Sequence, residues 1–298
     1  MNRIVVALCF VGSLMMIGCG GGRTSGICAH TNLKATAQGD AKALAVSGEE
    51  GWQARLDAGK LEQAIEAWEK SLAIDPSQAD LRVKLARAHY FLADGHLRFD
   101  EEKSDVMLKH FEAATNHSEL ALGQKYPGYA KKYCARRPFK QALAQVDKGA
   151  APAMYWYASA LGKYALAKSI VMILNEKDRI RAMMTTIREL DPTFFYTGPD
   201  RYFGAFYTKI PFPNGDLDRS AKHFEASIKG SPGYLASRVL YAELNRIKAG
   251  DRAKFKELLD SVVAFDLSQA PDLLPENTIE QRKAKALLEE IDVFFPEE

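Results

Sequence analysis

The sequence predicts an all-α fold in which helix pairs stack into a solenoid. Three observations support this prediction. Apolar residues recur at helical spacing from about residue 41 to residue 295, and three long helical segments stop at a polar residue followed by proline. Alternating runs of β-branched residues are absent, so we expect no strands. Together these observations predict one helical domain over residues 41–298.

Two segments share an apolar pattern at positions i, i+4, i+7 and i+11, which lie on one face of a helix. The pattern consists of Leu61, Ile65, Trp68 and Leu72 in the first segment and of Leu217, Ala221, Phe224 and Ile228 in the second. Further apolar stripes at 81–92 and 107–114 predict helices early in the chain, and a stripe at 279–294 predicts a last helix that caps the solenoid.

The ends of the helices resemble those of tetratricopeptide units. The stop signals are Asp75-Pro76, Asp191-Pro192 and Ser231-Pro232. Eight and twelve residues before the first and third proline stand an aromatic and a small residue, as in the second half of the tetratricopeptide pattern. The last two of these prolines are 40 residues apart instead of about 34, and residues 94–104 form an extra loop. We therefore expect degenerate repeats; an unrelated helical bundle is the alternative.

The first residues predict an export signal. Arg3 is followed at residues 4–17 by a nearly continuous apolar run that is too short to span a bilayer. The run ends in Gly18-Cys19, which resembles a bacterial lipobox with Met16 where leucine is usual. We therefore expect residues 1–18 to be a lipoprotein signal peptide and Cys19 to carry lipid. An ordinary secretory signal is the alternative.

Residues 19–40 are expected to be the lipidated cysteine and a flexible tether, because Gly20-Gly21-Gly22 follows Cys19. No acidic residue follows Cys19, which resembles the sorting signal of outer-membrane lipoproteins that face the periplasm. Cys28 and Cys134 remain after processing. In an oxidising periplasm they either pair or stay as two thiols, and the sequence leaves both open.

Composition and motifs exclude several functions. The chain of 298 residues is 47% hydrophobic with a net charge of +2, which argues against disorder and nucleic-acid binding. It contains no P-loop, no dinucleotide fingerprint, no zinc-protease motif and no nucleophile elbow, so we expect no enzyme and no cofactor. The histidines at 89 and 96, and those at 110 and 117, are seven residues apart. That is about 10.5 Å along a helix, too far for one ion, so we expect no metal site.

Clusters of aromatic residues predict a groove. Tyr155-Trp156-Tyr157 cannot enter one core together, because successive helical residues point about 100° apart. If Leu161-Gly162 occupies positions 7 and 8 of a repeat, the concave face of that unit carries Trp156, Ser159, Lys163 and Leu166. The next unit places Tyr202, Ala205 and Lys209 there. An aromatic and a lysine in each unit suit a ligand with an apolar body and an anionic end, or a loop of a partner. Packing between helices is the alternative for each ring.

Several segments resemble the T-component family of TRAP transporters. They are MYWYASALG at 154–162, GDL at 215–217 with AKHF at 221–224, RVLYA at 238–242, FKELL at 255–259 and ENTIEQRKA at 276–284. The resemblance covers about residues 56–295 and departs at Leu161, where an aromatic is common. It implies a trimeric periplasmic lipoprotein that associates with the substrate-binding protein of a tripartite ATP-independent periplasmic transporter. It also implies a pore or cleft for a hydrophobic or carboxylate small molecule.

The resemblance and the lack of catalytic motifs predict a subunit that binds this periplasmic protein and handles a small, partly hydrophobic ligand. Membrane contact is expected only through the lipid anchor. The alternative is a generic outer-membrane tetratricopeptide scaffold for an envelope assembly complex.

Overall fold

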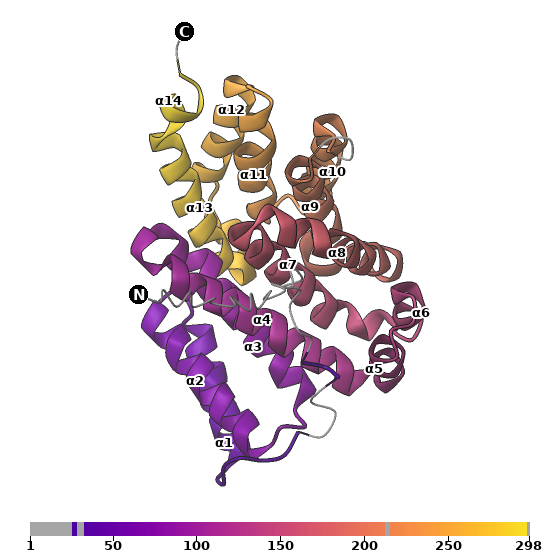
Figure 1. Cartoon of the computed structure of the whole chain (residues 1–298). Coiled ribbons are helices and arrows are strands. Elements are labelled where there is room, and N and C mark those ends of the chain that lie inside the picture. The colour runs from indigo at the N-terminus through magenta and orange to yellow at the C-terminus, as the bar shows by residue number, and fades with distance from the viewer. Residues whose placement is uncertain (1–25, 29–32, 212–214, 297–298) are drawn as a thin grey trace, which may run out of the picture.

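The computed structural model describes residues 26–28, 33–211 and 215–296 of the chain. These residues form α-helices and short 3-10 and π-helical turns, with no strand among them (Figure 1). The α-helices are α1 (Ala41–Gln53), α2 (Ala58–Ile74), α3 (Ala79–Phe91), α4 (Ser104–Lys125), α5 (Pro127–Cys134), α6 (Phe139–Leu143), α7 (Ala151–Lys168), α8 (Ile170–Leu190), α9 (Phe194–Lys209), α10 (Leu217–Gly230), α11 (Ala236–Leu240), α12 (Arg252–Val263), α13 (Leu274–Glu289) and α14 (Ile291–Phe294). The all-α prediction is confirmed.

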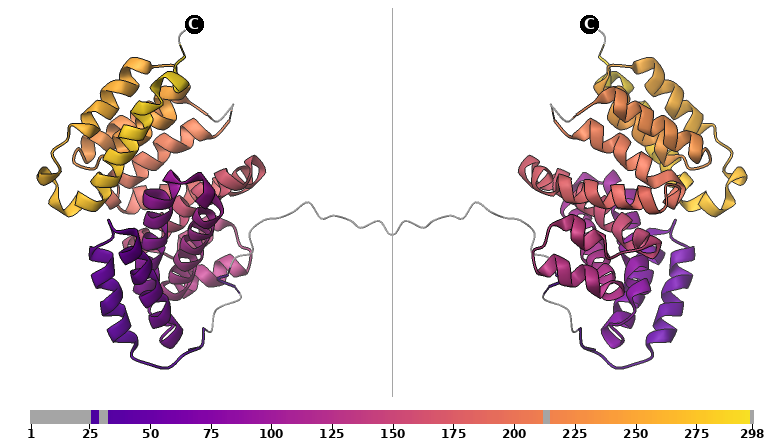
Figure 2. Two further views of the ribbon diagram at one scale, coloured as in Figure 1. Left: turned by 90° about the vertical axis from the view of Figure 1, so that its left-hand side faces the viewer. Right: turned by 90° about the vertical axis from the view of Figure 1, so that its right-hand side faces the viewer.

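Consecutive helices pack side by side in pairs. The pairs are α1 with α2, α3 with α4, α7 with α8, α9 with α10, and α11 with α12, while α5 and α6 are inserted after α4. Figure 2 shows that the early helices, drawn indigo to magenta, form the lower part of the molecule and the orange and yellow helices the upper part. This arrangement confirms the predicted solenoid of helix pairs.

The ends of the long helices follow the prolines. Helices α2, α8 and α10 end directly before Asp75-Pro76, Asp191-Pro192 and Ser231-Pro232, as predicted. Their first turns are capped by Asp57, Ser169 and Asp216, whose side chains each accept a backbone N–H three residues further on. Such a cap stabilises a helix by about 1 kcal/mol, so both ends of each second helix are fixed locally.

The prediction of an extra loop at residues 94–104 is wrong. Helix α3 continues into the π-helical turn Leu92–His96, and two 3-10 turns, Leu97–Phe99 and Glu101–Lys103, lead to α4. A π turn accommodates one extra residue without ending the helix, and such turns are frequent at functional sites. Here the turn carries the carboxylate of Asp94 toward the interior, where its side chain is 16% exposed.

Helix α13 closes the solenoid against its beginning. Lys283 donates to Asp94 Oδ2 at 2.7 Å, and Arg55 Nη2 lies 2.9 Å from Glu276 Oε2. Both lysine and glutamate stand on α13, whereas their partners belong to the first two helix pairs and their connections. The predicted capping helix therefore joins the early and late helix pairs through one buried and one partly buried ion pair, and the helices surround an interior space.

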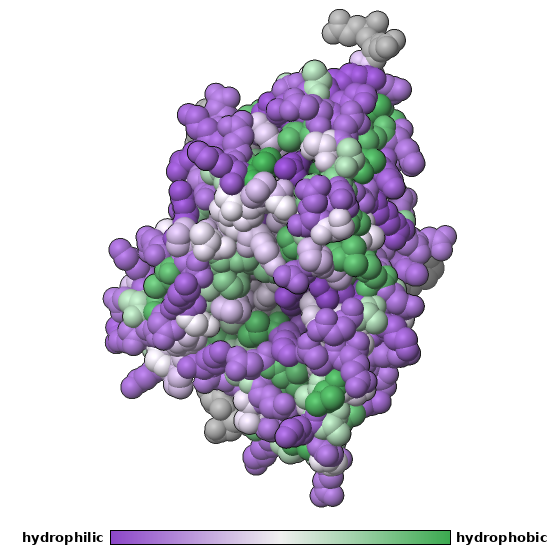
Figure 3. Space-filling model, turned by 180° about the vertical axis from the view of Figure 1, so that it is seen from behind, coloured by the Kyte–Doolittle hydropathy of each residue, from purple (hydrophilic) through white to green (hydrophobic). Residues whose placement is uncertain are grey.

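None of the helices in the described part of the chain is both long enough and apolar enough to cross a bilayer. Figure 3 shows the face opposite to that of Figure 1, where apolar side chains form separate groups within a mainly hydrophilic surface.

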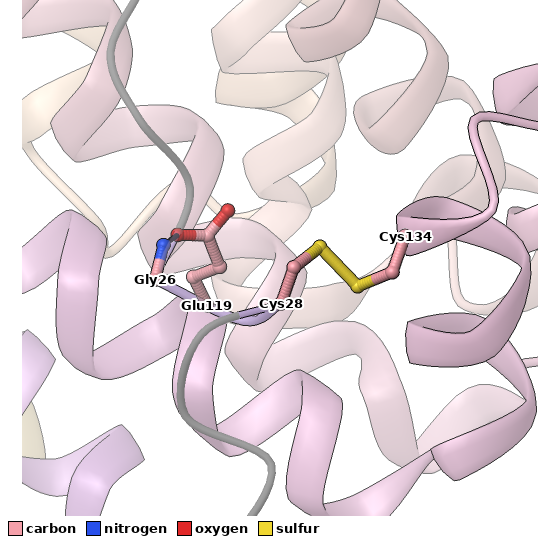
Figure 4. Close-up of a disulfide and its surroundings, with 4 residues drawn as sticks. All are labelled: Gly26, Cys28, Glu119 and Cys134. Atoms are coloured by element: carbon pink, nitrogen blue, oxygen red, sulfur yellow. Dashed lines mark hydrogen bonds between the residues drawn. A yellow bond between two sulfur atoms is a disulfide. The ribbon is translucent and has the colours of Figure 1, made fainter.

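A disulfide between Cys28 and Cys134 attaches the N-terminal segment to the domain, with the two Cα atoms 5.5 Å apart (Figure 4). Next to it, the backbone N–H of Gly26 donates to Glu119 Oε2 at 3.2 Å, and Ile27 is 3% exposed. Further on, the N–H of Thr36 donates to the carbonyl of Ala73 at 2.8 Å. Two parts of the expected tether at 19–40 are thus held against the domain. The predicted signal peptide and Cys19 lie outside the described residues.

Candidate functional site

Two neighbouring cavities lie inside the solenoid, with volumes of about 80 Å³ and about 270 Å³. Tyr90, Tyr155, Lys163, Arg201 and Leu240 line both of them. The cavities are therefore two compartments of one site, built by α3, α7, α9 and the helices that follow.

The structure brings the predicted groove residues together. Ser159, Lys163, Leu166, Tyr202 and Lys209 line the larger cavity, as does Ala205. Trp156 lines the smaller one, is 6% exposed, and lies with its ring centroid 4.8 Å from that of Phe195. The Trp156 ring therefore packs between helices and borders a cavity at the same time. That these residues bind a ligand or a partner stays a prediction.

The wall of the larger cavity is mainly apolar. The apolar side chains that line it include Ile173, Ile180, Phe206, Ile210, Leu240 and Leu244. Lys177 and Lys209 also line it, and Lys209 is exposed to solvent. Among the described residues that line it, the one carboxylate is that of Glu243, which is paired with Arg98 at 3.0 Å. An occupant would meet apolar side chains and positive charge.

Lys163 has a partner that the sequence did not predict. We expected its ammonium group to meet the anionic end of a ligand, but it lies 2.8 Å from Asp94 Oδ1. Burial alone raises the pKa of the Asp94 carboxyl, but Lys163, Lys283 and Arg98 outweigh this effect and hold that pKa well below its usual range. The charge of Lys163 is thus compensated within the protein by Asp94. Asp94 belongs to the π turn Leu92–His96, whereas the sequence predicted that it begins a loop.

Arg201 is a buried cation that the sequence did not single out. It is 4% exposed, and its guanidinium donates to the hydroxyl of Tyr155 at 2.8 Å and to the carbonyls of Phe195 and Tyr196 at 3.0 and 2.8 Å. The guanidinium also lies 4.5 Å from the centroid of the Tyr234 ring. These partners are neutral, and no carboxylate of the described residues lies within ion-pair distance of it. Arginine stays charged in proteins, so a positive charge without a counterion borders both cavities.

A strained turn supplies the carbonyl groups that hold Arg201. Phe195, Tyr196 and Thr197 have φ of 45°, 57° and 56°, the left-handed region, at the start of α9. Each such residue costs about 1–2 kcal/mol without glycine. The turn is held in place by Arg201 and by a 2.8 Å hydrogen bond between the Thr197 and Ser231 hydroxyls. Strain of this kind collects at binding sites, and no sequence signal announces it because none of the three is glycine.

Histidines gather elsewhere, where α2, α3 and α4 meet. His89 Nδ1 lies 2.8 Å from His110 Nδ1, and the His89 and His117 rings stack with centroids 5.6 Å apart. Spacing along one helix had separated these residues, but packing of α3 on α4 joins them. With Glu69, His89 and His117 form a group that offers three ligand atoms to a metal ion.

The fold defines this protein as a helical-pair solenoid, a class of proteins with concave inner surfaces. Comparison with protein families agrees: the TRAP transporter T-component family matches residues 75–295, and a tetratricopeptide repeat matches residues 53–92. The first match covers more than half of the chain, so this chain belongs to the TRAP transporter T-component family. A comparison with curated proteins found no match.

Proposed function

We propose that this T-component is a non-enzymatic lipoprotein that faces the periplasm, docks the periplasmic substrate-binding protein of its transporter, and takes up a small anion with an apolar body. Family membership supports the association with a TRAP transporter. The observation that carries the ligand proposal is Arg201, a buried cation without a carboxylate partner, which lines both cavities.

The lining supports an amphiphilic carboxylate. The apolar part of such a ligand would lie against Ile173, Ile180 and Leu244 in the larger cavity, and its carboxylate would lie toward Arg201. Arginine suits this role because its planar guanidinium bonds carboxylates in pairs of hydrogen bonds. A volume of about 270 Å³ is near the lower limit of ordinary ligand pockets, which favours a compact ligand.

An exposed apolar surface beside the larger cavity supports partner docking. At the junction of α7 and α8, the exposed fractions of Leu166, Ile170, Val171 and Leu174 are 40%, 57%, 62% and 37%. Leu166 also lines the larger cavity, so the apolar surface is continuous with that wall. Exposed apolar side chains grouped in this way are typical of interaction sites.

The N-terminal attachment supports a position close to the membrane. Cys19 stands seven residues before Gly26, the first residue described. Seven residues span about 25 Å at most, so a lipid on Cys19 would hold the domain near the bilayer surface. Outer-membrane location and the trimeric state are parts of this proposal that fractionation and native mass spectrometry test.

Docking is tested by calorimetry with the substrate-binding protein encoded nearest to this chain. We expect a dissociation constant near 1 μM, about −8 kcal/mol, because a carrier must bind and leave. Val171→Glu should weaken binding at least tenfold, whereas Val46→Glu is the matched control, since Val46 is 55% exposed on α1, away from the cavities. Folded protein that gives no heat and no co-elution at about 100 μM overturns the docking proposal and favours a generic scaffold.

Ligand uptake is tested with Trp156 as the only tryptophan, after Trp52→Phe and Trp68→Phe. A medium-chain carboxylate should shift the Trp156 emission, and the alcohol of the same chain length should bind more weakly. Arg201→Met should remove that preference. Equal binding of acid and alcohol to the parent protein would show that Arg201 does not select anions, and no shift with either would place the ligand elsewhere.

A further inference from the structure

A group of metal-binding side chains stands where α2, α3 and α4 meet. Glu69 on α2, His89 on α3 and His117 on α4 each offer one ligand atom, and these atoms lie within 4.8 Å of one another. Zinc holds such nitrogen and oxygen ligands tetrahedrally at about 2.0–2.2 Å, so two ligand atoms on one ion stand about 3.3–3.6 Å apart. Closing the group around one ion therefore requires side-chain movement of about 1 Å.

Glu69 is the side chain free to make that movement. Its side chain is 51% exposed, whereas that of His89 is 4% exposed, and Glu69 Oε1 lies 3.5 Å from His89 Nε2. The carboxylate can thus adjust its position toward an ion from the solvent side. It would also bring the negative charge that a divalent cation requires.

Two ring nitrogens at this place are buried. His117 Nδ1 has no hydrogen-bond partner among the described residues, and His89 Nε2 has only the Glu69 carboxylate, at the long distance of 3.5 Å. Buried polar atoms are nearly always satisfied, so an unpaired one needs an explanation, of which an unseen ion is one.

His110 positions the ring of His89. Its Nδ1 lies 2.8 Å from Nδ1 of His89, so one of these nitrogens donates to the other. When His89 is the donor, its Nε2 keeps a lone pair directed at the group. Histidine ligands in metal sites are commonly held through their second nitrogen in this way.

We propose that Glu69, His89 and His117 bind a divalent transition metal, zinc foremost, with His110 as a positioning residue and water as the remaining ligand. Imidazole with one carboxylate suits zinc, nickel or copper better than calcium or magnesium. Three protein ligands and an open position make this a site that exchanges its ion or a bound anion more readily than a closed structural site. The proposal does not depend on the transport role.

The test is titration of the purified full chain with zinc by calorimetry. We expect one equivalent to bind, and Glu69→Gln to weaken binding at least tenfold. Glu66→Gln is the matched control, because Glu66 lies on the same helix and its carboxylate pairs with the exposed Lys70 instead. Glu69→Gln changes one partly exposed group, so the variant should fold. Equal zinc affinity of Glu69→Gln and the parent overturns the proposal.

Cobalt gives a second, spectroscopic measurement. Bound Co²⁺ should show the visible bands of a four- or five-coordinate site with nitrogen and oxygen ligands, and His117→Asn should abolish them. His223→Asn is the control, because His223 pairs with Asp200 and stands on α10. A cobalt spectrum with thiolate charge-transfer bands would assign the metal to cysteine, and its absence in folded protein would leave the histidines as a metal-free stack; either result rejects the proposal.

Discussion

The pairs α1/α2 and α9/α10 are two versions of one unit. In each, a glycine of the first helix lies against an aromatic ring of the second: a Cβ on Gly48 would come 2.3 Å from the Trp68 ring, and one on Gly204 would come 2.7 Å from the Phe224 ring. Trp68 is 1% exposed and Phe224 0%. Both second helices end at a polar residue followed by proline.

The two pairs differ in how their first helices begin. Helix α1 starts as a regular helix with Asp40 as its cap, whereas α9 starts with the left-handed turn at 195–197. Only the second start brings an arginine and aromatic rings to the cavities, through Arg201 and Phe195. The shared pattern therefore builds the scaffold, and the departure from it builds the candidate site, as is expected when local rules are broken for function.

The largest effect on stability should come from removing the aromatic ring that lies against the glycine in each pair. Trp68→Ala and Phe224→Ala should each lower the free energy of unfolding by about 3–5 kcal/mol, because each empties a fully buried position against a glycine. Denaturant unfolding of the two variants, with the disulfide intact, measures both losses. A difference above about 2 kcal/mol between them would show that the two pairs are not equivalent.

The scaffold was predictable because its signals are local. Asp75-Pro76 and Ser231-Pro232 each end a helix by their own stereochemistry, and the spacing to Trp68 and Phe224 follows from one helix face. Repeat numbering even placed Leu166 and Tyr202 at the larger cavity, since that numbering fixes which side of a helix faces inward.

The chemistry of the site was not predictable because it depends on contacts across the fold. The charge of Lys163 is compensated by Asp94, 69 residues away. Arg201 is notable only because its neighbours are carbonyls and a hydroxyl, and its sequence context, Pro-Asp-Arg-Tyr, resembles an ordinary first helical turn. Glu69, His89 and His117 come together only because three helices meet, and the spacing of residues along one helix gives no sign of this.

The second prediction concerns the disulfide that attaches the N-terminal segment next to the early helix pairs, a covalent link that α9/α10 lacks. The Cys28–Cys134 disulfide closes a separation of 106 residues. Cys134→Ser should lower the free energy of unfolding by about 2–4 kcal/mol, mainly because the unfolded chain regains entropy. Reducing agent should destabilise the parent protein by the same amount and leave the variant unchanged. If the reductant has no effect on the parent, the cysteines are not paired in solution.

The third prediction compares two buried arginines that differ in their partners. Arg201→Met leaves the Tyr155 hydroxyl and two carbonyls without a partner, so we expect a loss of about 1–3 kcal/mol in stability and a loss of carboxylate binding. Arg55→Met is the counterpart, because Arg55 has Glu276 as its partner. It should cost at least as much stability, and ligand binding should persist. Loss of binding in both variants would mean that stability alone explains the Arg201 result.

The smallest effect concerns the left-handed turn that distinguishes α9 from α1. Arg136 is the reference, because it has φ of 51° in the exposed turn that follows α5, outside the two cavities. Arg136→Gly should stabilise the protein by about 0.5–1 kcal/mol, since relief of the left-handed penalty exceeds the entropy that glycine adds to the unfolded chain. Lys132→Gly in the right-handed part of α5 is the control and should cost about 1 kcal/mol.

Tyr196→Gly relieves the same penalty within the site but loses the stacking of Tyr196 on Tyr234, whose ring centroids lie 4.9 Å apart. That contact is worth about 0.5–1.5 kcal/mol, so the net change in stability should be near zero. Carboxylate binding should nevertheless weaken, because a freer turn no longer fixes the carbonyls that orient Arg201. Thermal unfolding and carboxylate titration of the Tyr196 and Arg136 variants separate the two effects. If Tyr196→Gly stabilises the protein as much as Arg136→Gly and binds carboxylate as the parent does, the strain at α9 is incidental to the site.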